Sequence, residues 1–221
     1  MLHKVVLAIL AALAMLTIGG PIPPTTSPTL SNVLFFGDSI TQGQHTDDFG
    51  FDFTWQVILG LRAKSPTNAQ QYLMDGVGGV TTGDFLAHLQ ALKLHPSQAQ
   101  LIVLELGTND YLQAVPLATM QQDLAALLAY LVADNPQARL VALNVWSNPA
   151  TPNSAGIPVS QYDSVISQVA ATWSGSRGSA VVDISTMFLT PDYHWPPGSP
   201  DTFHPNDAGH VAIAQAVVAA A

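Results

Sequence analysis

Short apolar runs alternate with longer amphipathic segments along most of this chain, and this alternation restricts the fold more than any other feature. Most of the short runs are apolar on both faces, as expected for parallel strands buried between two layers of helices. The five runs are Val33 to Phe36, Gln71 to Met74, Leu101 to Glu105, Leu140 to Val145 and Ala180 to Ile184. The pattern predicts an α/β fold, a three-layer α/β/α sandwich around a parallel sheet of about five strands.

Three longer segments repeat apolar residues at spacings of three and four, which is typical of helices that press one stripe onto a sheet. The stripes are Leu117, Met120, Leu124, Leu127, Leu128 and Leu131, then Tyr162, Val165, Ile166, Val169 and Trp173, and finally Val211, Ala214 and Val218. We expect Ser160 and Asp163 to cap the second helix. The third should begin after Asn206 and Asp207 and close the domain.

The amino terminus has the pattern of an export signal. Lys4 precedes an apolar run from Val5 to Ile18, which is shorter than the roughly 20 residues of a membrane span. Residues 1–20 are therefore expected to be a signal peptide, 21–30 a Pro/Thr/Ser-rich tether, and 31–221 a single domain. The predicted location is secreted or extracytoplasmic, with no stable membrane partner unless the first segment is retained.

Composition excludes several functions. Fifteen acidic residues against six basic ones give a net charge of −9, which repels nucleic acid. Cysteine is absent, so the chain has no disulfide framework, no thiolate metal site and no cysteine nucleophile. The oligomeric state does not follow from these observations.

Four short polar stretches lie where a sheet of this kind binds its ligands, beyond the carboxyl ends of the strands. Gly37 to Thr41, Gly76 to Thr81 and Gly107 to Asp110 follow the first three strand candidates, and Asp201 to Pro205 precedes the last helix. Together they resemble, in order and over nearly the whole domain, the four signature blocks of the SGNH (GDSL-type) hydrolase family.

The resemblance implies a flavodoxin-like SGNH hydrolase fold and a serine esterase that acts on carboxylic acid esters without a cofactor or a metal. Glu105 and Leu106 before Gly107 make the third block most similar to the thioesterase and lysophospholipase-like branch. One departure concerns the second block, where Met74 and Asp75 stand near the position at which the family often has asparagine.

The chemistry of ester cleavage explains these residue types. A serine hydroxyl needs a base to remove its proton, so His204 is expected to activate Ser39, and Asp201 to orient the imidazole from three residues earlier. The tetrahedral intermediate needs donors for its oxyanion. The resemblance assigns these to the backbone of Ser39, the backbone of Gly79 and the side chain of Asn109.

Each polar residue also has a plainer interpretation. Ser39 alone is typical of a helix N-cap, and Asp38 and Asp110 are expected to tie their loops to backbone N–H groups. Glu105, at the end of an apolar strand, should be a hydrogen-bonded buried carboxylate. His210 is a rival base, but it falls inside the last predicted helix, where a structural role is expected.

Aromatic and polar residues of the predicted loops are candidates for binding substrate. The four candidates are His45, Phe49, Trp146 and Trp195. Aromatic rings suit both stacking on sugars and lining an acyl pocket, and simple loop packing is an equal alternative. The expected substrate is a small-molecule ester or a polysaccharide ester.

Two other functions fit part of the pattern. An O-acyltransferase would use the same residues but pass the acyl group to an alcohol or sugar. A metal-dependent phosphoesterase would use Asp38, Asn109, His204 and His210, and it would lose activity with a chelator but tolerate Ser39→Ala.

Overall fold

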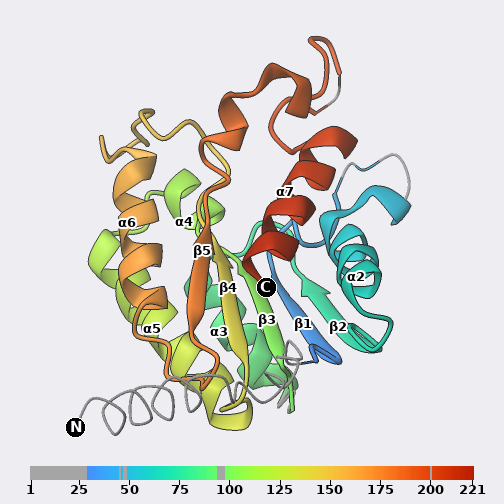
Figure 1. The fold of residues 1–221 in the computed structure, drawn as a ribbon. Coiled ribbons are helices and arrows are strands. Elements are labelled where there is room, and N and C mark those ends of the chain that lie inside the picture. The colour runs from blue at the N-terminus through green and yellow to red at the C-terminus, as the bar shows by residue number, and fades with distance from the viewer. Residues whose placement is uncertain (1–28, 45, 47–48, 94–97, 200) are drawn as a thin grey trace, which may run out of the picture.

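The computed structural model describes residues 29–44, 46, 49–93, 98–199 and 201–221. Five parallel strands form one sheet in the order β2-β1-β3-β4-β5, which confirms the predicted sheet (Figure 1). The strands are β1 (Asn32–Gly37), β2 (Gln71–Gly76), β3 (Leu101–Glu105), β4 (Arg139–Leu143) and β5 (Ser179–Val182). Gly37 pairs with both Gly76 and Glu105, so the carboxyl ends of the three strands at one side of the sheet are level.

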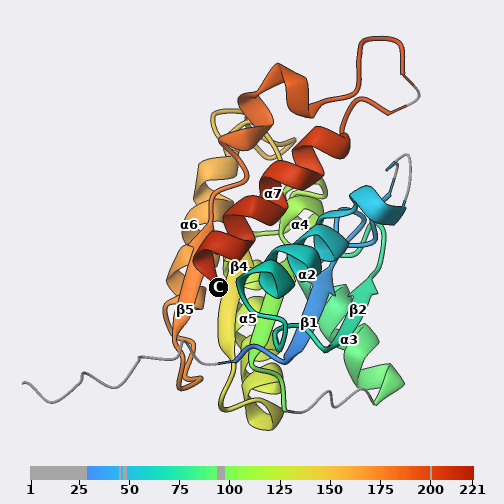
Figure 2. The same cartoon turned by 45° about the vertical axis from the view of Figure 1, so that its right-hand side comes forward.

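Helices cover both faces of the sheet, as Figures 1 and 2 show. On one face lie α3 (Thr82–Leu92), α5 (Leu117–Asp134) and α6 (Val159–Ala170), and on the other lie α2 (Phe53–Lys64) and α7 (Asp207–Ala220). Alternate residues of β1 enter the two layers, Phe36 on the α3 side and Phe35 on the α2 side. The predicted three-layer α/β/α sandwich is confirmed.

Four shorter elements lie in the connections. They are α4 (Thr108–Leu112) and the 3-10 turns η1 (Phe49–Phe51), η2 (Met187–Leu189) and η3 (Pro191–Tyr193). The helix α4 directly follows β3, so it brings the third polar stretch of the sequence to the carboxyl edge of the sheet.

The predicted stripe of α5 is buried except for the half-buried Leu117, and that of α6 is buried, with Trp173 beyond the end of the helix; the stripe of α7 is rotated. In α7 the buried face holds His210, Ile213 and Val217 together with the predicted Ala214, whereas Val211 and Val218 are only half-buried. A second prediction was wrong. Ser160 and Asp163 do not cap α6, because Pro158 is its N-cap residue and the Asp163 carboxylate accepts the backbone N–H of Val145 instead.

The helix α2 was not predicted. Phe53 and Trp55 lie in its first turn, where the Asp52 carboxylate caps the helix by accepting the Trp55 N–H at 2.8 Å. The apolar residues of α2 lie on all sides of the helix and not along one stripe, so its sequence lacks the spacing that indicates a helix.

The signal peptide predicted for residues 1–20 and most of the tether predicted for 21–30 lie outside the described residues. Among the helices that the structure describes, none is both long enough and apolar enough to cross a bilayer.

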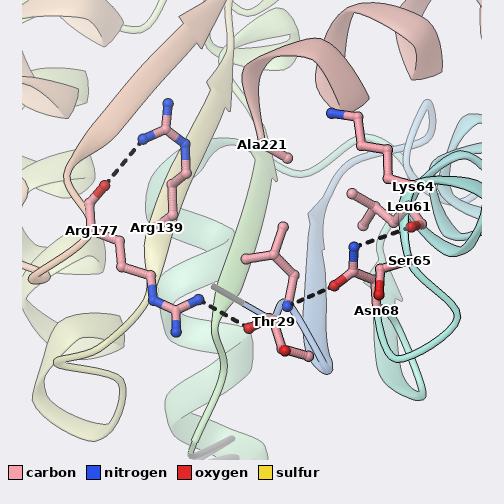
Figure 3. A pocket seen from close by; sticks show the side chains of 9 residues that line it. Thr29, Leu61, Lys64, Ser65, Asn68, Arg139, Arg177 and Ala221 are labelled. Atoms are coloured by element: carbon pink, nitrogen blue, oxygen red, sulfur yellow. Dashed lines mark hydrogen bonds between the residues drawn. The ribbon is translucent and has the colours of Figure 1, made fainter. Parts of the chain in front are cut away.

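A pocket of about 720 Å³ lies at the amino edge of the sheet, opposite the polar stretches (Figure 3). Its cationic side chains bind backbone carbonyls. Lys64 donates to Val218, and Arg139 donates to Ala220 at 2.8 Å, which satisfies carbonyls at the carboxyl end of α7. We assign these cations to the stability of that helix end.

Candidate active site

The turn after β1 presents Ser39 at the carboxyl edge of the sheet. The chain closes this turn at once, since the Gln42 N–H donates to the Asp38 carbonyl at 3.0 Å. A Cβ on Gly37 would lie 2.1 Å from Oγ1 of Thr41 and 2.4 Å from the carbonyl oxygen of Glu105, so the turn requires glycine. The Ser39 residue keeps 8% of its surface exposed.

Ser39, His204 and Asp201 form a continuous series of hydrogen bonds. Oγ of Ser39 lies 2.9 Å from Nε2 of His204, and Nδ1 of His204 lies 2.8 Å from Oδ2 of Asp201. Burial alone would raise the pKa of Asp201. The net effect is a lowered pKa, because its carboxylate accepts the backbone N–H groups of Phe203 and His204 and lies against the His204 ring. An ionised Asp201 only accepts, so Nδ1 of His204 carries the proton and Nε2 accepts the Ser39 hydroxyl.

The segment from Asp201 to His204 is a bend and not a turn of helix. Oδ1 of Asp201 accepts the backbone N–H of Phe203 at 2.9 Å and of His204 at 3.2 Å. This local turn brings the His204 ring to the other carboxylate oxygen because aspartate readily bonds to the backbone two and three residues ahead.

Two long-range contacts hold this segment against the domain. Nε1–H of Trp146 donates to the Phe203 carbonyl at 2.7 Å, and His194 forms an antiparallel bridge with Pro205. Trp146 is completely buried, so it supports the His204 segment from inside and does not line the surface as a substrate-binding loop residue. The burial of Trp146 agrees with loop packing, the alternative that the sequence left open for this candidate.

The structure says less about the contacts of the other three substrate-binding candidates. Trp195 is half-buried in the loop that leads to Asp201, and its Nε1 has no hydrogen-bond partner among the described residues. Phe49 lies in η1, and His45 lies outside the described residues.

Two of the predicted oxyanion donors lie close to Ser39. Asn109 contacts Asp38, the residue before Ser39, and Gly79 lies in a loop beside Ser39. Nδ2 of Asn109, in α4, donates to Oδ2 of Asp38 at 2.9 Å. Gly79 has φ of +80°, which glycine adopts without strain, and a Cβ on the adjacent Gly78 would lie 3.8 Å from the Ser39 Cβ. The structure thus brings Asn109 and the Gly79 loop to the nucleophile candidate, while their roles as oxyanion donors stay predictions.

Sequence reasoning missed Gln113. Its Nε2–H donates to the Gly79 carbonyl at 3.0 Å, and its backbone N–H donates to the Asn109 carbonyl at 2.9 Å. Gln113 therefore links the two predicted oxyanion elements. No sequence signal identifies it, because the link depends on a contact across 34 residues.

The departure at Asp75 has a structural explanation. Its carboxylate lies 3.1 Å from Nε2 of His88, and this pair joins the carboxyl end of β2 to α3. Asp75 thus anchors the strand that leads into the Gly79 loop.

Two buried carboxyl groups, those of Asp38 and Asp110, lie close to the site. Asp38 Oδ1 accepts the N–H of Ile40 at 3.0 Å, and Asp110 Oδ2 accepts the backbone N–H and the hydroxyl of Thr82, each at 2.9 Å. These bonds confirm that Asp38 and Asp110 tie their loops to backbone N–H groups. Burial raises the pKa of both, that of Asp38 to about 6.

His210 does not join these groups. It is completely buried, its Nδ1 accepts the Phe53 N–H at 3.2 Å, and its ring stacks on the Phe53 ring. The expected structural role of His210 is confirmed, so His210 does not serve as one of the metal ligands that a phosphoesterase would need. Within the described ranges, no three His, Cys, Asp or Glu side chains are grouped as a metal site requires.

Comparisons with known proteins agree with this architecture. The model of a family described as GDSL-like lipase/acylhydrolase matches residues 35–212. A search of curated proteins found no match.

Three solved structures share the fold. An acetyl xylan esterase is 20% identical with a TM-score of 0.63, over 86% of this chain and 98% of that one. A salicylyl-acyltransferase from a tetracycline biosynthetic pathway is 19% identical with a TM-score of 0.63, over 87% of this chain and 54% of that one. A two-domain esterase active on acetylated mannans is 20% identical with a TM-score of 0.61, over 85% of this chain and 47% of that one. This chain spans about half the length of the two-domain esterase.

Proposed function

The chain belongs to the GDSL-like lipase/acylhydrolase family, and we propose that it hydrolyses carboxylic acid esters through an acyl intermediate on Ser39. The observation that carries the proposal is the series of hydrogen bonds from Ser39 through His204 to Asp201, at 2.9 and 2.8 Å. Side chains from opposite ends of the domain meet there in the order that nucleophile, base and orienting acid require.

In the first half of the proposed reaction, Oγ of Ser39 attacks the ester carbonyl while its proton passes to Nε2 of His204. The carbonyl oxygen becomes an oxyanion, for which we propose the backbone N–H groups of Ser39 and Gly79 and the amide of Asn109 as donors. His204 then gives its proton to the departing alcohol. The acyl group stays on Ser39.

In the second half, water replaces the alcohol. His204 takes a proton from water, the hydroxide attacks the acyl carbonyl, and the proton returns to Oγ of Ser39 as the carboxylic acid leaves. Asp201 stabilises the imidazolium in both halves without taking its proton.

We propose short acyl esters, and O-acetyl groups on polysaccharide in particular, as the substrate class. Amide side chains lie beside the Gly78–Gly79 loop: a Cβ on Gly78 would lie 3.2 Å from Oε1 of Gln42 and 3.5 Å from Oε1 of Gln44, and Gln113 contacts Gly79. Such a polar rim favours a polar alcohol and a small acyl group over a lipid chain. The similar two-domain esterase, active on acetylated mannans, has been co-crystallised with mannopentaose, and another similar structure is an acetyl xylan esterase.

The first 30 residues support a secreted or extracytoplasmic location for this activity. We propose that residues 1–20 direct export and that 21–30 separate the domain from that segment. Amino-terminal sequencing of the protein recovered from the medium of an expressing culture tests this, and a chain that stays in the cytoplasm contradicts it.

Hydrolysis of p-nitrophenyl esters from acetyl to long-chain acyl, with acetylated xylan and mannan beside them, tests the proposed function. Ser39→Ala should lower kcat by at least about a thousandfold. The matched control Ser164→Ala, at an exposed serine of α6, should keep full activity. Activity should also survive a chelator. A fully active Ser39→Ala protein contradicts the serine mechanism.

A second candidate function is O-acyl transfer on the same residues, which the similar fold of the salicylyl-acyltransferase favours. An alcohol or sugar would then replace water in the second half. Product analysis with an added acceptor separates the two, because a transferase yields acylated acceptor in excess of free acid.

A further inference from the structure

Glu105 is a buried acid that the proposed reaction does not use. It is the last residue of β3, lies in register with Gly37, and is completely buried. Its Oε2 accepts the Thr41 hydroxyl at 3.1 Å and the Asp38 N–H at 3.4 Å. Its Oε1 has no hydrogen-bond donor in the part of the chain that the structure describes. A buried ionised carboxylate with one oxygen that accepts no hydrogen bond costs free energy, so a neutral acid fits the site better.

Asp38 lies beside Glu105, since its backbone N–H donates to Oε2 of Glu105 at 3.4 Å, and each of the two buried carboxyl groups affects the pKa of the other. A hydrogen bond between two carboxyl groups requires one proton. Asp38 already accepts N–H groups on both oxygens, from Ile40 on Oδ1 and from Asn109 on Oδ2. A proton for this pair therefore fits Oε1 of Glu105, which has no hydrogen-bond partner among the described residues.

The electrostatics of the pair agree with this placement. Burial raises the pKa of both acids, and the neighbouring Asp38 charge raises the pKa of Glu105 further, well above its usual range. The hydrogen bonds from Ile40, Glu105 and Asn109 act in the opposite direction on Asp38, while the Asp110 charge adds to the effect of burial. Asp38 is thus the more acidic member of the pair, and the proton stays on Glu105 at neutral pH.

We propose that Glu105, as a neutral acid, is a positioning residue for ester hydrolysis. It donates to Asp38, which holds the amide of Asn109, and it accepts from Thr41, which lies in the turn that carries Ser39. The inference rests on the proposed function, because it assigns Glu105 to the oxyanion side of that same site.

The effect on the reaction follows from the planarity of an amide. Once Asp38 accepts one N–H of the Asn109 amide, the direction of the other N–H is fixed as well. An oxyanion donor contributes about 10²–10³ in rate, and it does so only when it is aimed correctly. Loss of Glu105 should therefore lower kcat and leave KM nearly unchanged, because the oxyanion exists only after attack.

Four variants test the proposal, namely Glu105→Gln, Glu105→Met, Asn109→Ala and the double variant Glu105→Met/Asn109→Ala, each assayed with p-nitrophenyl acetate. Glutamine reproduces a neutral acid, with an N–H for Asp38 and an oxygen for Thr41, so kcat should stay within about threefold of the unchanged protein. Methionine keeps the length of the side chain but neither hydrogen-bonding group. Its kcat should fall by about 10- to 100-fold with KM within about twofold.

The double variant separates positioning from a general loss of structure. If Glu105 acts through Asn109, Glu105→Met should cost less than about threefold once Asn109 is already alanine. A merely structural role would cost the same factor in both backgrounds, and that result overturns the proposal. Circular dichroism and thermal unfolding show whether each variant is folded.

Glu105→Gln decides the question even if the methionine variant does not fold. A tenfold or larger loss of kcat in folded Glu105→Gln means that an ionised carboxylate is needed, which overturns the proposal. Ser39→Ala distinguishes the two levels of inference. If Ser39→Ala abolishes activity while all Glu105 variants keep it, the proposed function stands and only the role of Glu105 fails.

Discussion

Replacing His210 with asparagine should remove a pH dependence that this histidine gives to the stability of the fold. The imidazole is completely buried on the inner face of α7, and its Nδ1 accepts the Phe53 N–H. Burial, with a smaller contribution from His204, lowers the pKa of His210 to about 3. Asparagine places an oxygen close to the position of Nδ1, so it keeps an acceptor for Phe53 but does not titrate.

The magnitude follows from linkage between proton binding and folding. In the unfolded chain a histidine has a pKa of about 6.5, so below that pH the unfolded state binds a proton that the folded state refuses. The contribution of His210 to the free energy of unfolding is therefore complete above about pH 7 and declines as the pH falls. The loss is about 2 kcal/mol at pH 5 and about 4 kcal/mol at pH 3.

Buried acids act in the opposite sense. Asp38 and Asp163, whose pKa values burial raises to about 6, hold protons in the folded state that the unfolded state has lost, so they favour folding as the pH falls. The pH profile of the unchanged protein mixes these effects. Only a comparison between the protein and its His210→Asn variant isolates the histidine.

Urea unfolding followed by tryptophan fluorescence at pH 7.5 and pH 5.0 measures this comparison. The unchanged protein should lose about 2 kcal/mol more than His210→Asn between the two pH values. Val217→Ala, a substitution without a titrating group on the same buried face, is the control and should cost the same at both pH values. Equal losses for the unchanged protein and for His210→Asn would refute the reasoning, because His210 would then bind protons alike in the folded and unfolded states.

Three further predictions concern the site. Asp201→Asn should lower kcat by about 10³- to 10⁴-fold in steady-state assays, because the amide can donate to Nδ1 and leave the His204 proton on the wrong nitrogen; a loss below tenfold contradicts this role. Trp146→Phe keeps most of the packing but removes the 2.7 Å bond to the Phe203 carbonyl, so unfolding should become easier by about 1–2 kcal/mol and kcat should fall about tenfold; unchanged values would separate Trp146 from the His204 segment. Gly37→Ala should prevent the turn at Ser39 from closing and abolish activity, whereas Gly50→Ala, where a Cβ meets nothing within 4 Å, should be tolerated; an active Gly37→Ala protein contradicts the steric argument.

The fold and the three central side chains could be predicted from the sequence because both depend on local signals. Buried strands such as Leu101–Glu105 are continuous apolar runs, and the residues that do the proposed chemistry stand directly at strand ends or before the last helix. Ser39 and His204 are separately ambiguous. Their order along the chain, together with the other two blocks, predicted that Ser39 and His204 act together. The hydrogen bond between them agrees with this prediction.

The parts that could not be predicted depend on contacts between distant segments. Trp146 reads as a loop aromatic residue until the structure shows its indole beneath the carbonyl of Phe203, 57 residues later. Gln113 likewise acquires its role only when α4 meets the Gly79 loop. The helix α2 was missed for a different reason, because apolar residues on all sides conceal the period that a half-exposed helix shows.

The nucleophile candidate and its base are separated by 165 residues, since Ser39 follows the first strand and His204 precedes the last helix. During synthesis the hydroxyl emerges from the ribosome early, and the imidazole emerges 165 residues later, shortly before α7. A nascent or shortened chain that ends before residue 204 therefore contains a serine without a base. The proposed activity can begin only after all five strands of the sheet and His204 have been made and folded, so its appearance in a translation reaction would report that synthesis has passed residue 204.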